Sequence, residues 1–139
     1  MLTGSDAINE LTGSIIGAAM KVHSRLGPGL LEHTYAICLR HELEQVGLQV
    51  MAEVFVDLEY DGLLIQNAYR IDLVIEDKVI VELKAVEKVL PVHHSQVLTY
   101  LKLSKKEIGL LLNFNVSHLA DGIKRMTRTP LSASSVEPL

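Results

Sequence analysis

The chain opens with two segments in which apolar residues recur every three or four positions. This spacing is typical of helices that bury one face. The first segment predicts a helix over residues 6–25, which the sequence Gly27-Pro28-Gly29 ends. The second predicts a helix from there to Gly47, whose buried face would consist of Leu31, Tyr35, Leu39, Leu43 and Val46.

Alternating apolar and polar residues then predict a strand from Val50 to Tyr60. The turn sequence Asp61-Gly62 is expected to fold this strand back onto a second one that ends at Ile75. Two more apolar runs, 79–86 and 108–114, predict buried strands with a helix over 92–103 between them. The segment from 115 to 128 is ambiguous. Residues 129–139, with two prolines and three serines, predict a disordered tail.

These elements predict one α/β domain over residues 1–128. The apolar strands at 71–75, 79–86 and 108–114 need cover on both faces, and helices can supply it. We therefore expect an α/β/α sandwich with a central mixed β-sheet. The length of 139 residues and the 48% hydrophobic content suit a globular domain with a real core.

Charged residues interrupt the apolar strands in the middle of the chain. Glu82 and Lys84 are two residues apart in the run 79–86, so they share one face of that strand. Asp72 interrupts the preceding strand and comes near Glu82 if the chain folds back at residues 76–78. Burying such charges costs several kcal/mol, on the order of the penalty for buried ions, unless partners meet them.

Two carboxylates about 4 Å apart repel by roughly 4 kcal/mol at an effective dielectric constant of about 20. Either they share a proton or they share a cation. A divalent ion is the simpler solution, and Mg²⁺ or Mn²⁺ prefers such hard oxygen ligands. The alternative is structural, with a Glu82–Lys84 pair that satisfies itself and Asp72 in solvent at the end of its strand.

Polar residues on two predicted helices are candidates for the same site. Glu32 lies one turn before Tyr35 near the start of its helix. A glutamate there also stabilises the helix dipole, and Tyr35 also suits the core. Gln96 and Tyr100 are four residues apart on the helix over 92–103, with His93 one turn earlier, and could equally form a surface pair.

The distribution of charge adds a candidate surface. The net charge of −4 argues against a general nucleic-acid coat, but residues 1–83 hold 5 basic and 13 acidic residues while residues 84–139 hold 8 and 4. Phosphate could dock on this basic second half. The single cysteine, Cys38, excludes a disulfide framework and a thiolate zinc site. No segment is apolar enough to span a membrane and no signal peptide is present, so we expect a cytoplasmic protein.

Six short motifs follow one another along residues 5–126. They are Gly29-x-x-Glu32-x-x-Tyr35, Tyr69-Arg70-x-Asp72, Val81-Glu82-Leu83-Lys84, Pro91-Val92-His93, Gln96-x-x-x-Tyr100 and Leu110-Leu111-Leu112-Asn113-Phe114. In this order they resemble the GxxExxY proteins of the PD-(D/E)XK nuclease superfamily. The Gln-x-x-x-Tyr element is similar to that of RecB-type exonuclease domains. The proline expected before the first acid is replaced by Ile71.

The resemblance implies a restriction-endonuclease-like core and a metal-dependent nuclease that acts on DNA rather than RNA, in repair or defence. Asp72 and Glu82 would bind Mg²⁺ or Mn²⁺ together with the Leu83 carbonyl. Glu32 would supply a further acid ligand, and Lys84 would orient or activate the attacking water.

Other residues would hold the substrate. Gln96 and Tyr100 would support the site or the substrate strand, and the nucleic acid would be contacted by Tyr35, Arg70, Lys88 and His93. The main alternative is a module of the same fold that binds nucleic acid or protein without cutting. A structural or toxin-accessory protein is a third possibility, for which no sequence feature speaks.

Overall fold

The computed structural model describes residues 4–128. The predicted tail over 129–139 lies outside them. In chain order the elements are α1 (Gly4–Leu26), α2 (Glu32–Gln45), β1 (Val50–Tyr60), β2 (Leu63–Ile75), β3 (Val79–Lys84), α3 (Pro91–Ser104), β4 (Ile108–Asn113), the 3₁₀ helix η1 (Leu119–Gly122) and β5 (Ile123–Thr127). Every element predicted up to residue 114 is present, and the ambiguous segment after it forms η1 and β5.

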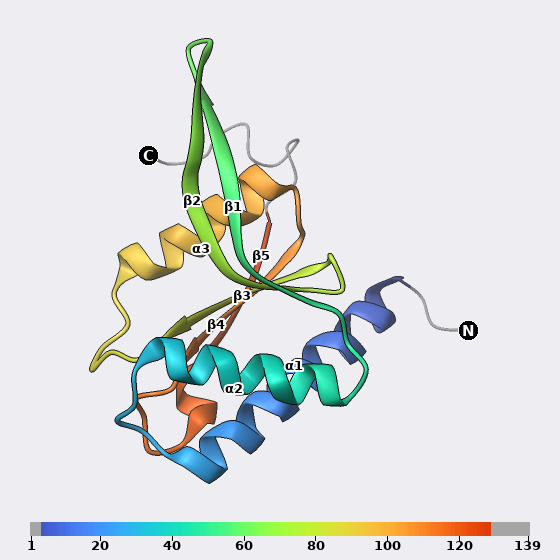
Figure 1. Ribbon diagram of the computed structural model, residues 1–139, viewed down its shortest axis with the longest axis vertical. Helices are drawn as coiled ribbons and strands as arrows, with labels where there is room; N and C mark the ends of the chain where they lie inside the picture. Colours follow the sequence, from blue (N-terminus) through green and yellow to red (C-terminus); the bar gives the residue numbers. More distant parts are fainter. Residues whose placement is uncertain (1–3, 129–139) are drawn as a thin grey trace.

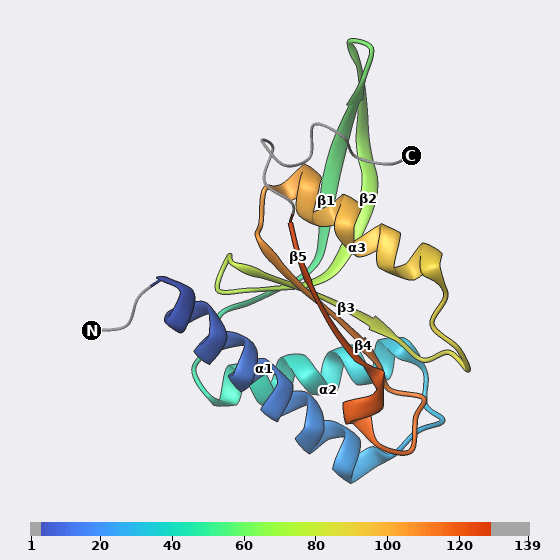
Figure 2. The same ribbon diagram turned by 180° about the vertical axis from the view of Figure 1, so that it is seen from behind.

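The five strands form one mixed sheet in the sequential order β1-β2-β3-β4-β5. Only β3 and β4 are parallel, because the helix α3 connects them as a crossover. Helices α1 and α2 cover one face of the sheet and α3 covers the other (Figures 1 and 2). The predicted α/β/α sandwich with a central mixed sheet is therefore confirmed.

Each face of the sheet has its own apolar core. The larger core lies beneath α1 and α2 and includes Ile15, Leu39, Leu73, Val81 and Leu110. The smaller core lies beneath α3 and is formed by Ile71, Val74, Ile80, Val97, Tyr100, Leu101 and Leu111.

The β1–β2 hairpin changes layer partway along its length. Ala52 and Leu73 pair with each other and belong to the core beneath α1 and α2. The next pair along the two strands, Val54 and Ile71, belongs to the core beneath α3. Between the two pairs Glu53 has a φ of 52°, in the left-handed region. The hairpin bends there and then extends past α3 (Figure 1). Asp72 lies in β2 at this bend.

The predicted buried face of the second helix is wrong at both ends. Leu31 is 77% exposed and Val46 is 64% exposed. The helix begins only at Glu32 and ends at Gln45, so the side chains of Leu31 and Val46 belong to the residues that flank it. In residues 4–128, no helix is long and apolar enough to cross a membrane.

Candidate active site

Asp72 and Glu82 lie opposite each other on the β2–β3 hairpin. Leu73 pairs with Val81, and the same antiparallel register extended by one residue pairs Asp72 with Glu82. The Asp72 backbone N–H donates to Glu82 Oε1 at 3.2 Å, and the Leu83 N–H donates to Asp72 Oδ2 at 2.9 Å. The turn over residues 76–78 thus brings the two acids together, as the charge pattern predicts.

Burial controls the protonation of this pair. Glu82 is only 5% exposed, and the Nζ of Lys84 lies 3.9 Å from its Oε2. Burial, and after it the negative charge of Asp72, raises the pKa of Glu82 from its ordinary value of 4.5 to about 8. Burial and the neighbouring carboxylate of Asp72 thus favour the protonated form of Glu82 in the metal-free protein, and the Lys84 ammonium opposes this only in part.

The donors around this pair fit Mg²⁺ or Mn²⁺. Both side chains offer carboxylate oxygen, and a cation between them would offset the repulsion from Asp72 that helps to raise the pKa of Glu82. Mg²⁺ is commonly held by one or two carboxylates, with water and substrate oxygens in its other positions. Within residues 4–128, no three His, Cys, Asp or Glu side chains are grouped closely enough to hold an ion. The expectation that Glu32 completes a set of three acid ligands is therefore not met.

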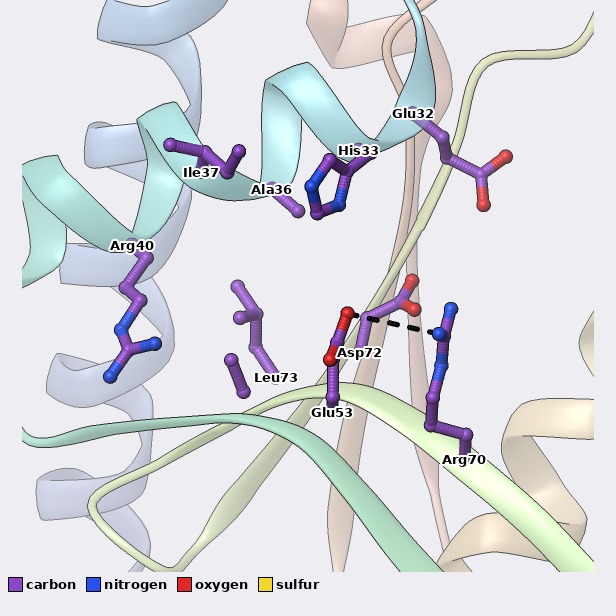
Figure 3. A pocket seen from close by; sticks show the side chains of 10 residues that line it. Glu32, His33, Ala36, Ile37, Arg40, Glu53, Arg70, Asp72 and Leu73 are labelled. Atoms are coloured by element: carbon purple, nitrogen blue, oxygen red, sulfur yellow. Dashed lines mark ion pairs between the residues drawn. The ribbon is translucent and has the colours of Figure 1, made fainter.

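A pocket of about 410 Å³ opens beside Asp72, between α2 and the bend of the β1–β2 hairpin (Figure 3). Glu32 lines it from the first turn of α2, so this acid shares the pocket with Asp72, but the two do not form a group of three ligands with Glu82 in the described residues. Arg70 lies on the strand side, where its Nη1 is 3.7 Å from Glu53 Oε1. The full lining consists of Glu32, His33, Ala36, Ile37, Arg40, Ala52, Glu53, Arg70, Asp72 and Leu73.

Helix α3 approaches the acids from the other layer. Tyr100 is 6% exposed, and burial together with the charges of Glu82 and Asp72 raises its pKa to about 12. Its ring packs edge-on against Tyr69, with centroids 5.6 Å apart. One turn earlier, the Oε1 of Gln96 is buried and accepts no hydrogen bond from the described residues. Tyr100 thus lies in the buried part of this helix, within electrostatic range of the acid pair, whereas Gln96 is half-buried.

The remaining predicted contacts fall in three different settings. His93 accepts a hydrogen bond at Nδ1 from the Leu90 N–H, 2.9 Å away, and so caps the start of α3. Lys88 is exposed on the loop before this helix. Arg70 is the one of these residues that lines the pocket of Asp72.

Tyr35 holds the loop that precedes α2. It is fully buried and stacks on Phe114 with ring centroids 4.5 Å apart. Its hydroxyl donates to the Gly27 carbonyl and accepts from the Leu30 N–H. These bonds give Tyr35 a structural role in the turn that places Glu32 at the start of the helix, and its predicted substrate contact stays a prediction.

Asn113 holds the chain near Lys84 in place, a role that the sequence motif containing it did not indicate. It is 3% exposed and pairs in register with Lys84 on the neighbouring parallel strand. Its side chain accepts from the Val86 N–H at 3.1 Å and donates to the Val86 carbonyl at 2.9 Å. This clamp fixes the chain just after Lys84. The sequence did contain a signal for this residue. Asn113 is a polar residue at the end of the apolar run of β4, as Glu82 is a polar residue within the apolar run of β3.

A mixed sheet between helices, with two acids and a lysine on adjacent strands, defines a restriction-endonuclease-like protein. Residues 9–126 match the PD-(D/E)XK nuclease superfamily, and the chain belongs to that superfamily. Its members are generally nucleases and generally use divalent metal ions.

A solved structure supports the fold. The crystal structure of SSO0001 is similar to this chain with a TM-score of 0.54 and 22% sequence identity. The likeness covers 74% of this chain and 53% of that one, so this chain spans about half the length of the solved protein. No curated protein matches the chain.

Proposed function

We propose that this protein is a metal-dependent nuclease that hydrolyses phosphodiester bonds in DNA. The observation that carries the proposal is the meeting of Asp72, Glu82 and Lys84 at the bend of the sheet. Three charged groups in a largely buried strand pair cost stability, and a site that binds a metal ion and a phosphate explains their presence.

The chemistry follows from what each side chain offers. Mg²⁺ or Mn²⁺ held by Asp72 and Glu82 would lower the pKa of a bound water and act as a Lewis acid on the phosphate. The Leu83 N–H orients the Asp72 carboxylate, and Asn113 fixes the strand end that carries the lysine. Lys84 then places its ammonium group beside the scissile phosphate, where it neutralises charge and orients the attacking water.

The finer parts of the proposal rest on the motif resemblance. The spacing of Gly29, Glu32 and Tyr35 supports membership of the GxxExxY group within the superfamily. On that likeness we propose DNA rather than RNA as substrate and a role in repair or defence, and from the sequence pattern we propose a cytoplasmic setting. Gln96 and Tyr100 would support the acid pair from α3.

The direct test incubates the pure protein with labelled single- and double-stranded DNA and RNA in Mg²⁺, Mn²⁺ or EDTA. We expect metal-dependent cleavage of DNA that Asp72→Asn, Glu82→Gln and Lys84→Ala each reduce by about 100-fold or more. Glu10→Gln, which removes an exposed carboxylate on α1, is the matched control and should keep full activity. Absence of cleavage, with no divalent-ion binding by calorimetry, would favour the binding module instead.

A further inference from the structure

Helix α2 has a second face that is turned toward the pocket of Asp72, and only Ala36 of this face also packs against the core. His33, Ala36, Ile37 and Arg40 follow one another at i, i+3, i+4 and i+7, and all four line this pocket (Figure 3). Ile37 is 57% exposed, although isoleucine is usually buried. The middle of this face is therefore an apolar surface that the fold leaves open beside the acid.

Small side chains keep the pocket open. Ala36 on the helix and Ala52 on β1 both line it, and each contributes only a methyl group. Leu73, next to Asp72, also lines the pocket, although it is 1% exposed and belongs to the core beneath α1 and α2. A volume of about 410 Å³ lies in the range of small-molecule sites, so the space is large enough for a single nucleotide unit.

Two arginines flank this apolar surface. In Figure 3, Arg40 and Arg70 lie at opposite sides of the pocket with Asp72 between them. The Nε of Arg40 is 3.5 Å from Glu44, and Arg70 is 3.7 Å from Glu53. These side chains are all about half exposed, and exposed ion pairs contribute little, so a phosphate can replace the glutamates.

We propose that this pocket is a subsite for one unpaired nucleotide next to the scissile phosphate, and that the substrate is DNA with a single-stranded segment at the cut. In a duplex the grooves show only the edges of the bases. A base can lay its face on Ile37, or stack on the His33 ring, only when it is unpaired. The inference rests on the proposed nuclease function and specifies its substrate class.

The charge of the neighbouring hairpin argues for the same substrate. Residues 51–69 of the β1–β2 hairpin contain no Lys, Arg or His. They carry four acidic residues, all exposed: Glu53, Asp57, Glu59 and Asp61. A second DNA strand that lay along this hairpin would meet its negative surface and be repelled, whereas a single strand can reach the two arginines at the pocket without following the hairpin.

The test is binding measured by fluorescence anisotropy in EDTA, so that no cleavage interferes. The probes are a fluorescein-labelled single-stranded DNA, the blunt duplex of the same sequence, and that duplex with a single-stranded overhang. We expect the single strand and the overhang to bind about tenfold or more tightly than the blunt duplex. Ala36→Leu, which fills the pocket, and Ile37→Ser, which removes apolar surface, should each lower single-strand affinity about tenfold. Ala7→Leu, on the exposed part of α1, is the matched control and should change nothing.

Equal affinity for blunt and single-stranded DNA, or no single-strand binding at all, would overturn the subsite. So would pocket variants that fold with the wild-type melting temperature and bind the single strand as wild type does. Cleavage in Mg²⁺ separates the two proposals. Single-strand binding that depends on the pocket, with no cleavage, would support the subsite and contradict the proposed nuclease activity. If blunt and overhang DNA are cleaved at the same rate, and Ile37→Ser does not change that rate, the nuclease activity is supported and the subsite is contradicted.

Discussion

Single residues at the bend link the stability of this protein to its chemistry. Glu82 is buried opposite Asp72, and its pKa is raised to about 8. A folded-state pKa above the unfolded value means that the native protein binds a proton that the unfolded chain releases. The acid pair therefore stabilises the metal-free fold at low pH and loses that contribution as pH rises.

The raised pKa of Glu82 predicts how the free energy of unfolding changes with pH, and over which pH range. In metal-free buffer, the free energy of unfolding should fall between about pH 4.5 and 8 by an amount on the order of a few kcal/mol, and then level off. Glu82→Gln removes the titrating group, so its unfolding free energy should vary much less over this window and should match or exceed that of the wild type at pH 8. Urea denaturation across the window measures both, with Glu10→Gln as a control that should follow the wild type. A wild-type curve that rises through this window would contradict the assignment.

The sequence could predict the acids of the site better than their neighbours. Asp72, Glu82 and Lys84 stand out because a charge inside an apolar run is visible in the sequence itself. Glu53 and Arg40 are ordinary exposed charges, and only the packing of α2 against the bent hairpin brings them to one pocket. Motif spacing also could not show that the Tyr35 hydroxyl and the His93 ring are hydrogen-bonded to the backbone.

At the scale of elements, the packing of α3 on the sheet depends on one glycine. A Cβ built at Gly109 in β4 would lie 2.7 Å from the Cγ1 of Val97, on the buried face of α3. The absence of a side chain there lets the helix approach the strand closely. The same helix carries Tyr100 and Gln96, so this contact also sets their distance from the acid pair.

Gly109→Ala should therefore destabilise the fold by about 1–3 kcal/mol through overpacking. Combining it with Val97→Ala should cost less than the sum of the two single changes, because the second substitution removes the clash. Gly13→Ala is the matched control, since nothing lies within 4 Å of its Cβ on α1, and it should stabilise by about 0.5–1 kcal/mol. If the changes in unfolding free energy of Gly109→Ala and Val97→Ala simply add in the double variant, the contact between these two residues does not determine how closely α3 packs on β4.

Periodicity predicted most elements because each buries a face of regular spacing. The hairpin turn was also readable, since Asp61 and Gly62 both have positive φ, as a two-residue turn of this kind requires. Strand β5 was missed because it is five residues long at a sheet edge, with none of its residues buried. The bend at Glu53 had no sequence signal, since glutamate is not a residue that favours positive φ.

At the scale of the whole molecule, a metal ion should act as a ligand of the folded state. The acid pair exists only when β2 and β3 are paired, so the unfolded chain has no equivalent site. An ion that binds only the native state raises stability by about 2.7 kcal/mol when present at a hundred times its dissociation constant.

Mg²⁺ or Mn²⁺ should accordingly raise the melting temperature by several degrees. The rise should be larger at higher pH, because the ion competes with the proton on Glu82. Asp72→Asn should abolish it. Asp57→Asn, an exposed acid on β1, should leave it intact, and NaCl at matched ionic strength should give no such rise. Scanning calorimetry with and without EDTA is the measurement, and an equal shift in Asp72→Asn would place the ion elsewhere.

The position of β1 at the edge of the sheet has a consequence for how copies of this protein meet in solution. Its outer backbone groups are a template for another strand, and its exposed carboxylates, Glu53, Asp57 and Glu59, line that template. Two such edges side by side would oppose like charges. Neutralising all three acids should promote aggregation in light scattering at neutral pH, whereas neutralising Glu10, Glu87 and Glu107 should not. The negative charge of the hairpin thus prevents copies of the protein from adding edge to edge into a continuous sheet.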